Sequence, residues 1–243
     1  MDNDNKSIEI WNKVLKASLS IPGAKIDRTS FLTKELSKRV SETQMQSAIE
    51  SNPAKAGIPR ATMDEVAKAS IKWHLTQVTS ISFLAGLPGG WWMAGTIPAD
   101  LAQFYWHVIQ VVQKLAYIYG WPELYSVDEI DDETLLQITL FIGVMMGAKG
   151  AAKIVSELAE RVSAEVAKRL PRAALTKYGI YTLAKQVAKW IGVKLTKDIF
   201  SRIASKIVPI LGGAVSGAIS YVTMKSMSRR LSSHLRSLAI AGS

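Results

Sequence analysis

The sequence predicts an all-α protein, a single multi-helix bundle of about eight helices, some of them broken by glycine or proline. Apolar residues recur at helical spacing through most of the chain, whereas the apolar–polar alternation typical of strands is rare. Apolar residues make up 48% and charged residues 21% of the 243 residues, which is an ordinary globular balance. Glycine and proline fall between the apolar stretches, where they end helices.

The expected helices follow one another along the chain. Pro22-Gly23 and the two prolines of 51–59 separate the first three helices. Gly120 ends the fourth, and the acidic residues of 128–133 suit the positive end of the fifth helix's dipole. We expect 1–60 to form an N-terminal helical region and 61–243 the main helical domain, together one continuous unit. The approximate helix ranges are 5–19, 27–50, 61–84, 98–119, 128–147, 148–169, 181–206 and 209–238.

The segment 85–98 cannot be a regular helix throughout, because it holds four glycines and two prolines. Trp91 and Trp92 are adjacent within it, so the two cannot share one buried helical stripe. Pro98 starts the next helix, and Asp100 is placed to cap free backbone N–H groups there. On that helix the core-spaced residues are Leu101, Tyr105, Val108, Val112, Leu115 and Tyr119.

The net charge of +10 is concentrated in the last third of the chain. Residues 1–165 hold 16 basic and 19 acidic side chains, whereas residues 166–243 hold 14 basic side chains and one acid, Asp198. Such asymmetry is typical of proteins with an anionic partner, although a solvated basic face that aids solubility would give the same pattern. Within 181–206 the lysines and arginines lie mostly off the apolar stripe of Ala184, Val187, Ile191, Leu195, Ile199 and Ile203.

Two long stretches, 73–99 and 207–224, carry no formal charge. The first is broken by glycine and proline, and the second, which contains Pro209, is barely long enough to span a bilayer. Gly213 and Gly217 form a GxxxG pair that permits close helix contact in lipid or in a core. We therefore expect no classical transmembrane helix; both stretches are either core or hairpins that dip into a leaflet.

Nothing in the sequence indicates a catalytic, metal or cofactor site. The chain has no cysteine, and His74, His107 and His234 are scattered without a metal-binding spacing. Asp100, Gln103, His107, Gln110 and Lys114 share a helical row, but Asp100 and His107 are about 10.5 Å apart along the axis, too far for a hydrogen bond. We expect no cofactor and no metal, and we interpret the chain as a binding protein more readily than an enzyme.

Three segments resemble the EcsC protein family of bacteria: GLPGGWWMAGTIPADL at 86–101, YIYGW at 117–121, and IVPILGGAVSGAISYVTMKSMSRR at 207–230. The resemblance implies an all-α, cytoplasmic, membrane-associated protein without an established activity, and it brings no catalytic residues. The positions that match the family's recurrent ones are interpreted as architectural, and they are Pro98, Asp100, Gly120, Pro209, Gly212 and Gly213.

The leading hypothesis is a protein that binds anionic lipid surfaces through its basic C-terminal third, at the inner face of the membrane. The first residues, MDNDNKS, lack the features of a signal peptide, which favours a cytosolic address. A membrane protein is a further possible partner. The alternatives are a pore-forming or membrane-remodelling effector, a nucleic-acid binder supported by charge alone, and an enzyme with a site around Asp100 and His107. The residues expected at the membrane are Trp91, Trp92, Lys185, Lys189, Lys197, Arg202, Lys206, Arg229 and Arg230.

Overall fold

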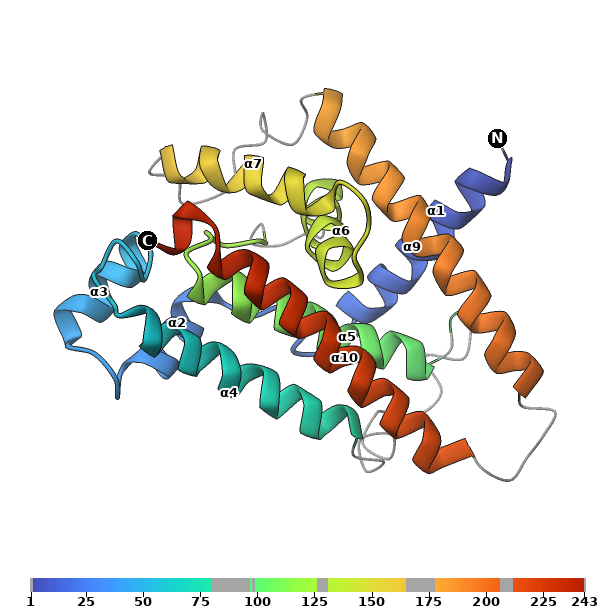
Figure 1. The fold of residues 1–243 in the computed structure, drawn as a ribbon, viewed down its shortest axis with the longest axis horizontal. Helices are drawn as coiled ribbons and strands as arrows, with labels where there is room; N and C mark the ends of the chain where they lie inside the picture. The colour runs from blue at the N-terminus through green and yellow to red at the C-terminus, as the bar shows by residue number, and fades with distance from the viewer. Residues whose placement is uncertain are drawn as a thin grey trace.

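The computed structural model describes residues 2–79, 97, 99–125, 131–164, 178–205 and 212–242. Within these ranges the chain forms nine α-helices and no β-sheet, which confirms the predicted fold class (Figure 1). The helices are α1 (Asp2–Leu19), α2 (Arg28–Leu36), α3 (Glu42–Glu50), α4 (Arg60–Thr79), α5 (Ala99–Ile118), α6 (Asp132–Met146), α7 (Ala151–Ala164), α9 (Tyr178–Ser205) and α10 (Gly212–Arg236), followed by the short 3₁₀ helix η3 (Ala239–Ala241).

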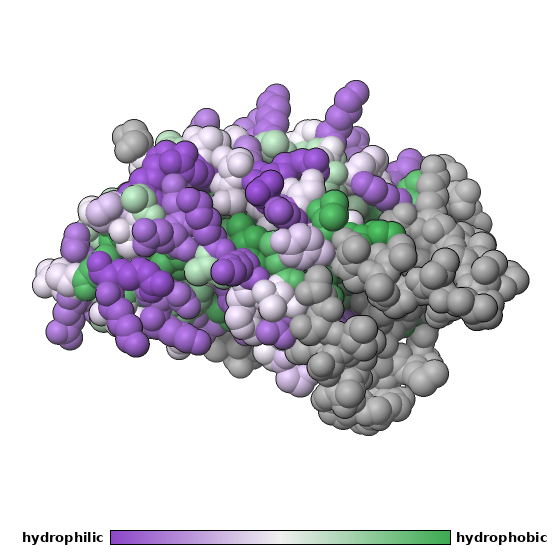
Figure 2. Space-filling view, turned by 60° about the horizontal axis from the view of Figure 1, so that its bottom comes forward, coloured by the Kyte–Doolittle hydropathy of each residue, from purple (hydrophilic) through white to green (hydrophobic). Residues whose placement is uncertain are grey.

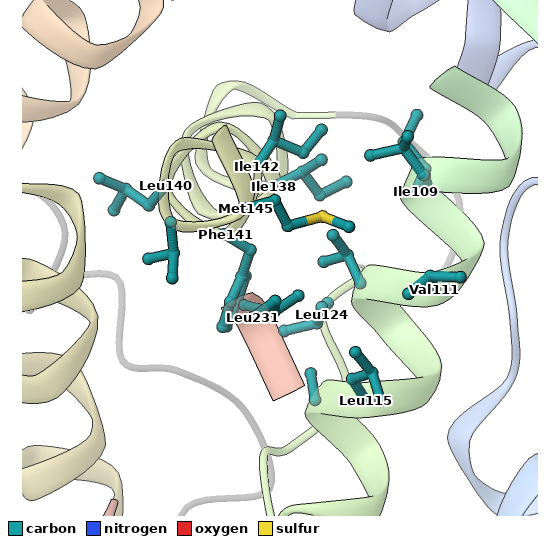
Figure 3. Packing of buried hydrophobic residues seen from close by; sticks show 14 of the residues in the cluster. Ile109, Val111, Leu115, Leu124, Ile138, Leu140, Phe141, Ile142, Met145 and Leu231 are labelled. Carbon is teal, nitrogen blue, oxygen red and sulfur yellow. The ribbon is translucent and has the colours of Figure 1, made fainter. Parts of the chain in front are cut away.

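Helix α5 is the centre of the fold. It contacts α1, α2, α4, α6 and α10, and nearly every described side chain from Tyr105 to Ile118 is buried. All six core positions predicted for this helix are buried, as the helical spacing indicated. Figure 3 shows how apolar side chains of α5, α6 and α10 meet in one cluster, with Phe141 and Leu231 near its middle. The long apolar face of α5 therefore organises the other helices around it.

Helices α4, α5 and α10 lie parallel or antiparallel to one another. Asp64 near the start of α4 bonds Tyr119 just beyond α5 and Arg236 at the end of α10, so α4 runs antiparallel to both of these helices. The end of α4 and the starts of α5 and α10 consequently lie together at the opposite end of the bundle (Figure 1). We call this opposite end the distal end. The uncharged stretches 73–99 and 207–224 both include helix ends located there.

Helix α9 packs closely against α1 and α6. A Cβ on Gly192 would lie 1.9 Å from the backbone oxygen of Ser7, and a Cβ on Gly143 would lie 2.5 Å from the side chain of Val187. At Gly192 the neighbour is backbone, so only glycine permits α1 and α9 to approach this closely. The predicted apolar stripe of α9 faces this contact, because Ala184, Val187, Ile191 and Leu195 are buried. Ile199 and Ile203 have side chains outside the described residues.

The single helix expected at 27–50 is wrong, because the chain forms α2 and α3 instead. Ser41 begins α3 with a capping box in which its side chain and that of Gln44 satisfy each other's backbone N–H groups. Helices α6 and α7 begin at Asp132 and Ala151, a few residues after the expected starts at 128 and 148. Asp131 accepts a hydrogen bond from the Thr134 N–H at 2.8 Å to cap α6, and Gly120 has a left-handed φ of 96° after α5.

Candidate functional site

The exposed positions of α9 include large apolar side chains beside lysines. Tyr181, Leu183, Trp190 and Val193 are exposed, with Trp190 at 38%. The Lys185 amine lies 4.5 Å from the centre of the Tyr181 ring, and the Lys194 amine lies 5.0 Å from that of Trp190. Both distances suit cation–π attraction. This arrangement keeps each cation beside an apolar group at the surface.

The middle of α10 presents a similar mixture. Ile219 is 59% exposed and Val222 is 64% exposed, which is unusual for branched aliphatic side chains. The Lys225 amine lies 5.4 Å from the centre of the Tyr221 ring, and Arg229 is exposed one turn further on. Figure 2 shows hydrophobic surface between hydrophilic side chains on one face of the molecule, reaching up to the atoms drawn in grey. We call the exposed apolar and basic side chains of α9, and those of α10 from Ile219 to Arg229, the basic–apolar surface.

The structure uses two of the expected membrane-facing cations within the fold. Lys189 forms an ion pair with Asp4 of α1 at 2.5 Å, and Arg230 donates a hydrogen bond to the Met145 carbonyl at 2.8 Å. Lys185 and Arg229 are exposed as expected. Lys194, which was not among the expected residues, is exposed as well, and its i,i+4 spacing from Trp190 was the signal in the sequence that could have identified it.

Several expected residues fall outside what the structure describes. Trp91, Trp92, Lys206, Pro98 and Pro209 lie outside the described residues altogether. Three others lie in helices but have undescribed side chains, namely Asp100 in α5 and Lys197 and Arg202 in α9. Gly212, Gly213 and Gly217 belong to the first turns of α10. Within the described parts of the chain, no helix is both long and apolar enough to cross a membrane.

A second group of polar residues lies inside the bundle between α4 and α5. His74 and His107 are scattered in the sequence, but in the fold their Nδ1 atoms are 3.0 Å apart and both side chains are buried. The Lys114 amine is 3.0 Å from Nε2 of His74 and 5.0 Å from the centre of the Trp73 ring. We call His74, His107 and Lys114 the histidine–lysine cluster.

Burial and mutual repulsion shift the acid–base properties of this cluster. Burial, followed by the charge of Lys114 and then by His107, lowers the pKa of His74 to about 2. Burial and the charge of Lys114 lower the pKa of His107 to about 4. Burial lowers the pKa of Lys114 to about 8, although Glu35 raises it. At neutral pH the two imidazoles are therefore neutral and most of the Lys114 is charged.

These charge states fix the hydrogen-bond directions. The Lys114 ammonium has only donors, so it donates to Nε2 of His74. His74 must then carry its proton on Nδ1 and donate to Nδ1 of His107, which carries its own proton on Nε2. A metal ion does not fit here, because the Lys114 ammonium would repel it. Elsewhere in the described chain, no three His, Cys, Asp or Glu side chains are placed to hold a metal.

The helical row that included Asp100 and His107 does not converge on one site. Gln110 donates to the Gly23 carbonyl at 2.6 Å, so it holds the turn after α1 and not the histidine–lysine cluster. Gln113 binds the same turn through the Ala24 carbonyl at 2.7 Å. The row therefore divides between two neighbours of α5, which spacing along one helix could not reveal.

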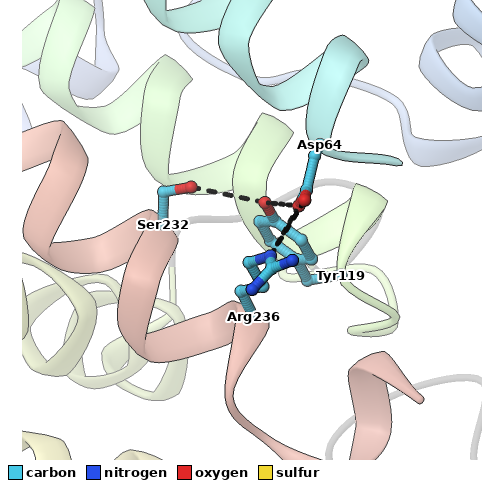
Figure 4. A network of polar contacts seen from close by, with 4 residues as sticks. All are labelled: Asp64, Tyr119, Ser232 and Arg236. Atoms are coloured by element: carbon cyan, nitrogen blue, oxygen red, sulfur yellow. Dashed lines mark hydrogen bonds and ion pairs between the residues drawn. The ribbon is translucent and has the colours of Figure 1, made fainter. Parts of the chain in front are cut away.

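A surface network ties together the end of the bundle opposite the distal end (Figure 4). Tyr119 donates to Asp64 at 3.0 Å and lies 3.3 Å from the Ser232 hydroxyl. Arg236 donates to both carboxylate oxygens of Asp64, at 2.9 and 3.0 Å. Because this network joins α4, the residue after α5, and α10, its role is structural.

Comparisons of the chain with protein-family models, with curated proteins and with solved structures found no match.

Proposed function

We propose that the protein attaches reversibly to anionic membranes through the basic–apolar surface. The observation that carries this proposal is where the exposed apolar side chains lie. Six of the large apolar side chains that the described residues expose are on α9 and α10, within the third of the chain that holds 14 basic residues and one acid. Exposed apolar groups beside lysines suit a membrane interface, where the lysine reaches the headgroups and the apolar group enters the acyl boundary.

The energies support attachment of this reversible kind. A lysine or arginine near an anionic surface contributes about 1 kcal/mol, so Lys185, Lys194 and Arg229 would contribute about 3 kcal/mol together. Apolar area that leaves water adds about 25 cal/mol per Å², and Trp190, Ile219 and Val222 have such area to bury. The two contributions are separable, since salt screens the first and leaves the second.

Flotation with vesicles of phosphatidylcholine alone, or mixed with phosphatidylserine, tests the proposal. We expect binding only to the mixed vesicles, with a clear loss in high salt. Replacing both Lys185 and Lys194 with Gln should weaken binding about 30-fold, if each lysine contributes about 1 kcal/mol. Lys153→Gln is the matched control, because Lys153 is an exposed lysine on α7, outside the basic–apolar surface. Equal recovery of unbound protein with both kinds of vesicle would refute the proposal.

A membrane-inserting effector is the second candidate, favoured by one observation. The helix ends that border the uncharged stretches 73–99 and 207–224 lie together at the distal end, so both stretches could act on one bilayer. Release of a trapped dye from the mixed vesicles separates this candidate from simple attachment. Membership of the EcsC family, and a location at the inner face of the cytoplasmic membrane, remain proposals that rest on the sequence.

A further inference from the structure

The histidine–lysine cluster forms the contact between α4 and α5 near the distal end. His74 lies in the second half of α4, and His107 lies in the first half of α5. The two helices are joined in sequence by residues 80–98, which belong to the uncharged stretch. Trp73 packs edge-on to His74, with ring centres 4.6 Å apart, and Trp106 does the same to His107 at 4.7 Å. The contact therefore has a polar centre within an aromatic surround.

The hydrogen bonds of this contact leave no place for an added proton. If His74 gained one, its Nε2–H would point at the Lys114 ammonium. If His107 gained one, its Nδ1–H would point at the Nδ1–H of His74. In either case two donors face each other at 3.0 Å inside the fold, and a second positive charge lies near Lys114. The contact holds only while both imidazoles are neutral.

We propose that His74 and His107 form an acid-sensitive latch, which holds the second half of α4 against α5 at neutral pH and opens on acidification. The separated helices would expose both imidazoles to water, where each accepts a proton at its ordinary pKa of 6.5. Below that value the open state binds protons that the closed state cannot, so the closed state loses stability as the pH falls. Above it the latch is at full strength.

The charges of the described neighbouring residues do not cancel this effect. Helix α2 brings Glu35 and Lys34, which act on Lys114 with opposite signs. The Lys225 amine of α10 lies over the Tyr221 ring of its own helix, and Lys13 of α1 pairs with Glu9. Helix α6 carries its acids in its first turn, at Asp132 and Glu133. Among these described groups Glu35 is the acid that acts on the cluster, and it does so by raising the pKa of Lys114.

Opening the latch would free the two helices that flank 80–98, and this connects the latch to membranes. That connection rests on the proposed function, whereas the latch itself rests on the buried contact. An acidic aqueous phase or an acidic membrane surface would then favour the open arrangement of α4 and α5. The ligand is the same anionic bilayer, and protonation of His74 and His107 changes how the protein contacts it.

Hydrogen exchange measured by mass spectrometry on the full chain, without lipid, tests the latch directly. We compare α4 and α5 peptides at pH 7.5 and pH 5.0, after correction for the intrinsic exchange rate. We expect these peptides to lose at least tenfold in protection at pH 5.0 in the wild type. The variant with both His74→Gln and His107→Gln keeps neutral hydrogen-bonding groups and should show little change with pH. His234→Gln, which alters a histidine on α10, should behave as the wild type does.

Equal pH dependence in the wild type and the double variant would overturn the latch, as would unchanged protection in the wild type. If the double variant does not fold, His107→Gln alone serves the same comparison, with the pH-induced loss expected to shrink. Flotation with the mixed vesicles at both pH values then tests the connection. If the protein binds these vesicles at neither pH, the proposed function is refuted, whereas the latch is still judged by the exchange data.

Discussion

Replacing Gly192 with Ala tests how α9 is held, because two opposing effects meet at this position. Alanine favours the helix over glycine by about 1 kcal/mol. Against this, the new Cβ would lie 1.9 Å from the Ser7 backbone oxygen, and no side-chain rotation can relieve a clash with backbone. Helices α1 and α9 would have to separate by about 1 Å, and a gap of that size forfeits up to half of the dispersion energy of each contact.

The cost of the clash should exceed the gain in helix propensity. Overpacking a buried contact costs typically about 1–3 kcal/mol and occasionally more, and the backbone partner places this case at the upper end. After the gain in helix propensity, we expect a net loss of about 2 kcal/mol in the free energy of unfolding, which lowers the Tm of a chain of this size by about 4–8 °C. Thermal and urea unfolding followed by circular dichroism measure both quantities.

The control for this prediction is Gln186→Ala, an exposed position on the same helix. Its effect should stay within about 0.5 kcal/mol. A Gly192→Ala variant as stable as the wild type, or more stable, would refute the reasoning. It would mean that helix propensity outweighs the contact and that α1 and α9 are not held at the observed distance.

Three further predictions concern buried polar groups. The wild type should lose free energy of unfolding between pH 7.5 and pH 5.0, because the pKa of His107 is 6.5 in the unfolded chain and about 4 in the fold. His107→Gln should make this loss smaller by about 2 kcal/mol. Urea unfolding at both pH values measures the difference. Arg28→Met should lower the free energy of unfolding by about 3 kcal/mol, because the buried guanidinium donates to four backbone carbonyls. These are the carbonyls of Trp121, Ile49, Ala48 and Ser51. In the same assay Arg39→Met, at a more exposed position, should cost less than about 0.5 kcal/mol. Tyr119→Phe should cost about 1 kcal/mol, since it removes the hydroxyl that binds Asp64, and an unchanged urea midpoint would contradict this role.

The sequence predicts the fold class and the core of α5 correctly because both depend on local periodicity. A buried helix must repeat its apolar residues with the period of the helix, so Leu101, Tyr105 and Val108 reveal which face turns inward. The break between α2 and α3 was also present in the sequence. Ser41 and Gln44 form a capping box, and the apolar spacing across 27–50 obscured it.

The histidine–lysine cluster could not be predicted in the same way. His74 and His107 are 33 residues apart and belong to different helices, so their contact depends on how α4 and α5 are aligned. No spacing rule within one helix contains that alignment. The same reason explains why Gln110, which shares a helical row with His107, binds the turn after α1 instead. Chemistry built from two helices becomes visible only once the helices are packed.

The distribution of side-chain size on α9 gives the strongest reason to assign a role to its outward face. Towards α1 and α6 the helix buries Ile191 and Leu195 together with small residues such as Gly192, and it leaves Trp190 and Tyr181 partly exposed. A helix selected only for packing would bury its largest apolar side chains, since each contributes about 1.5–3 kcal/mol when buried. On α9 the two largest described aromatic side chains, Tyr181 and Trp190, are instead left partly in water, each beside a lysine. A surface that keeps these groups in water has a cost in solubility, and burial in a bilayer interface would offset it.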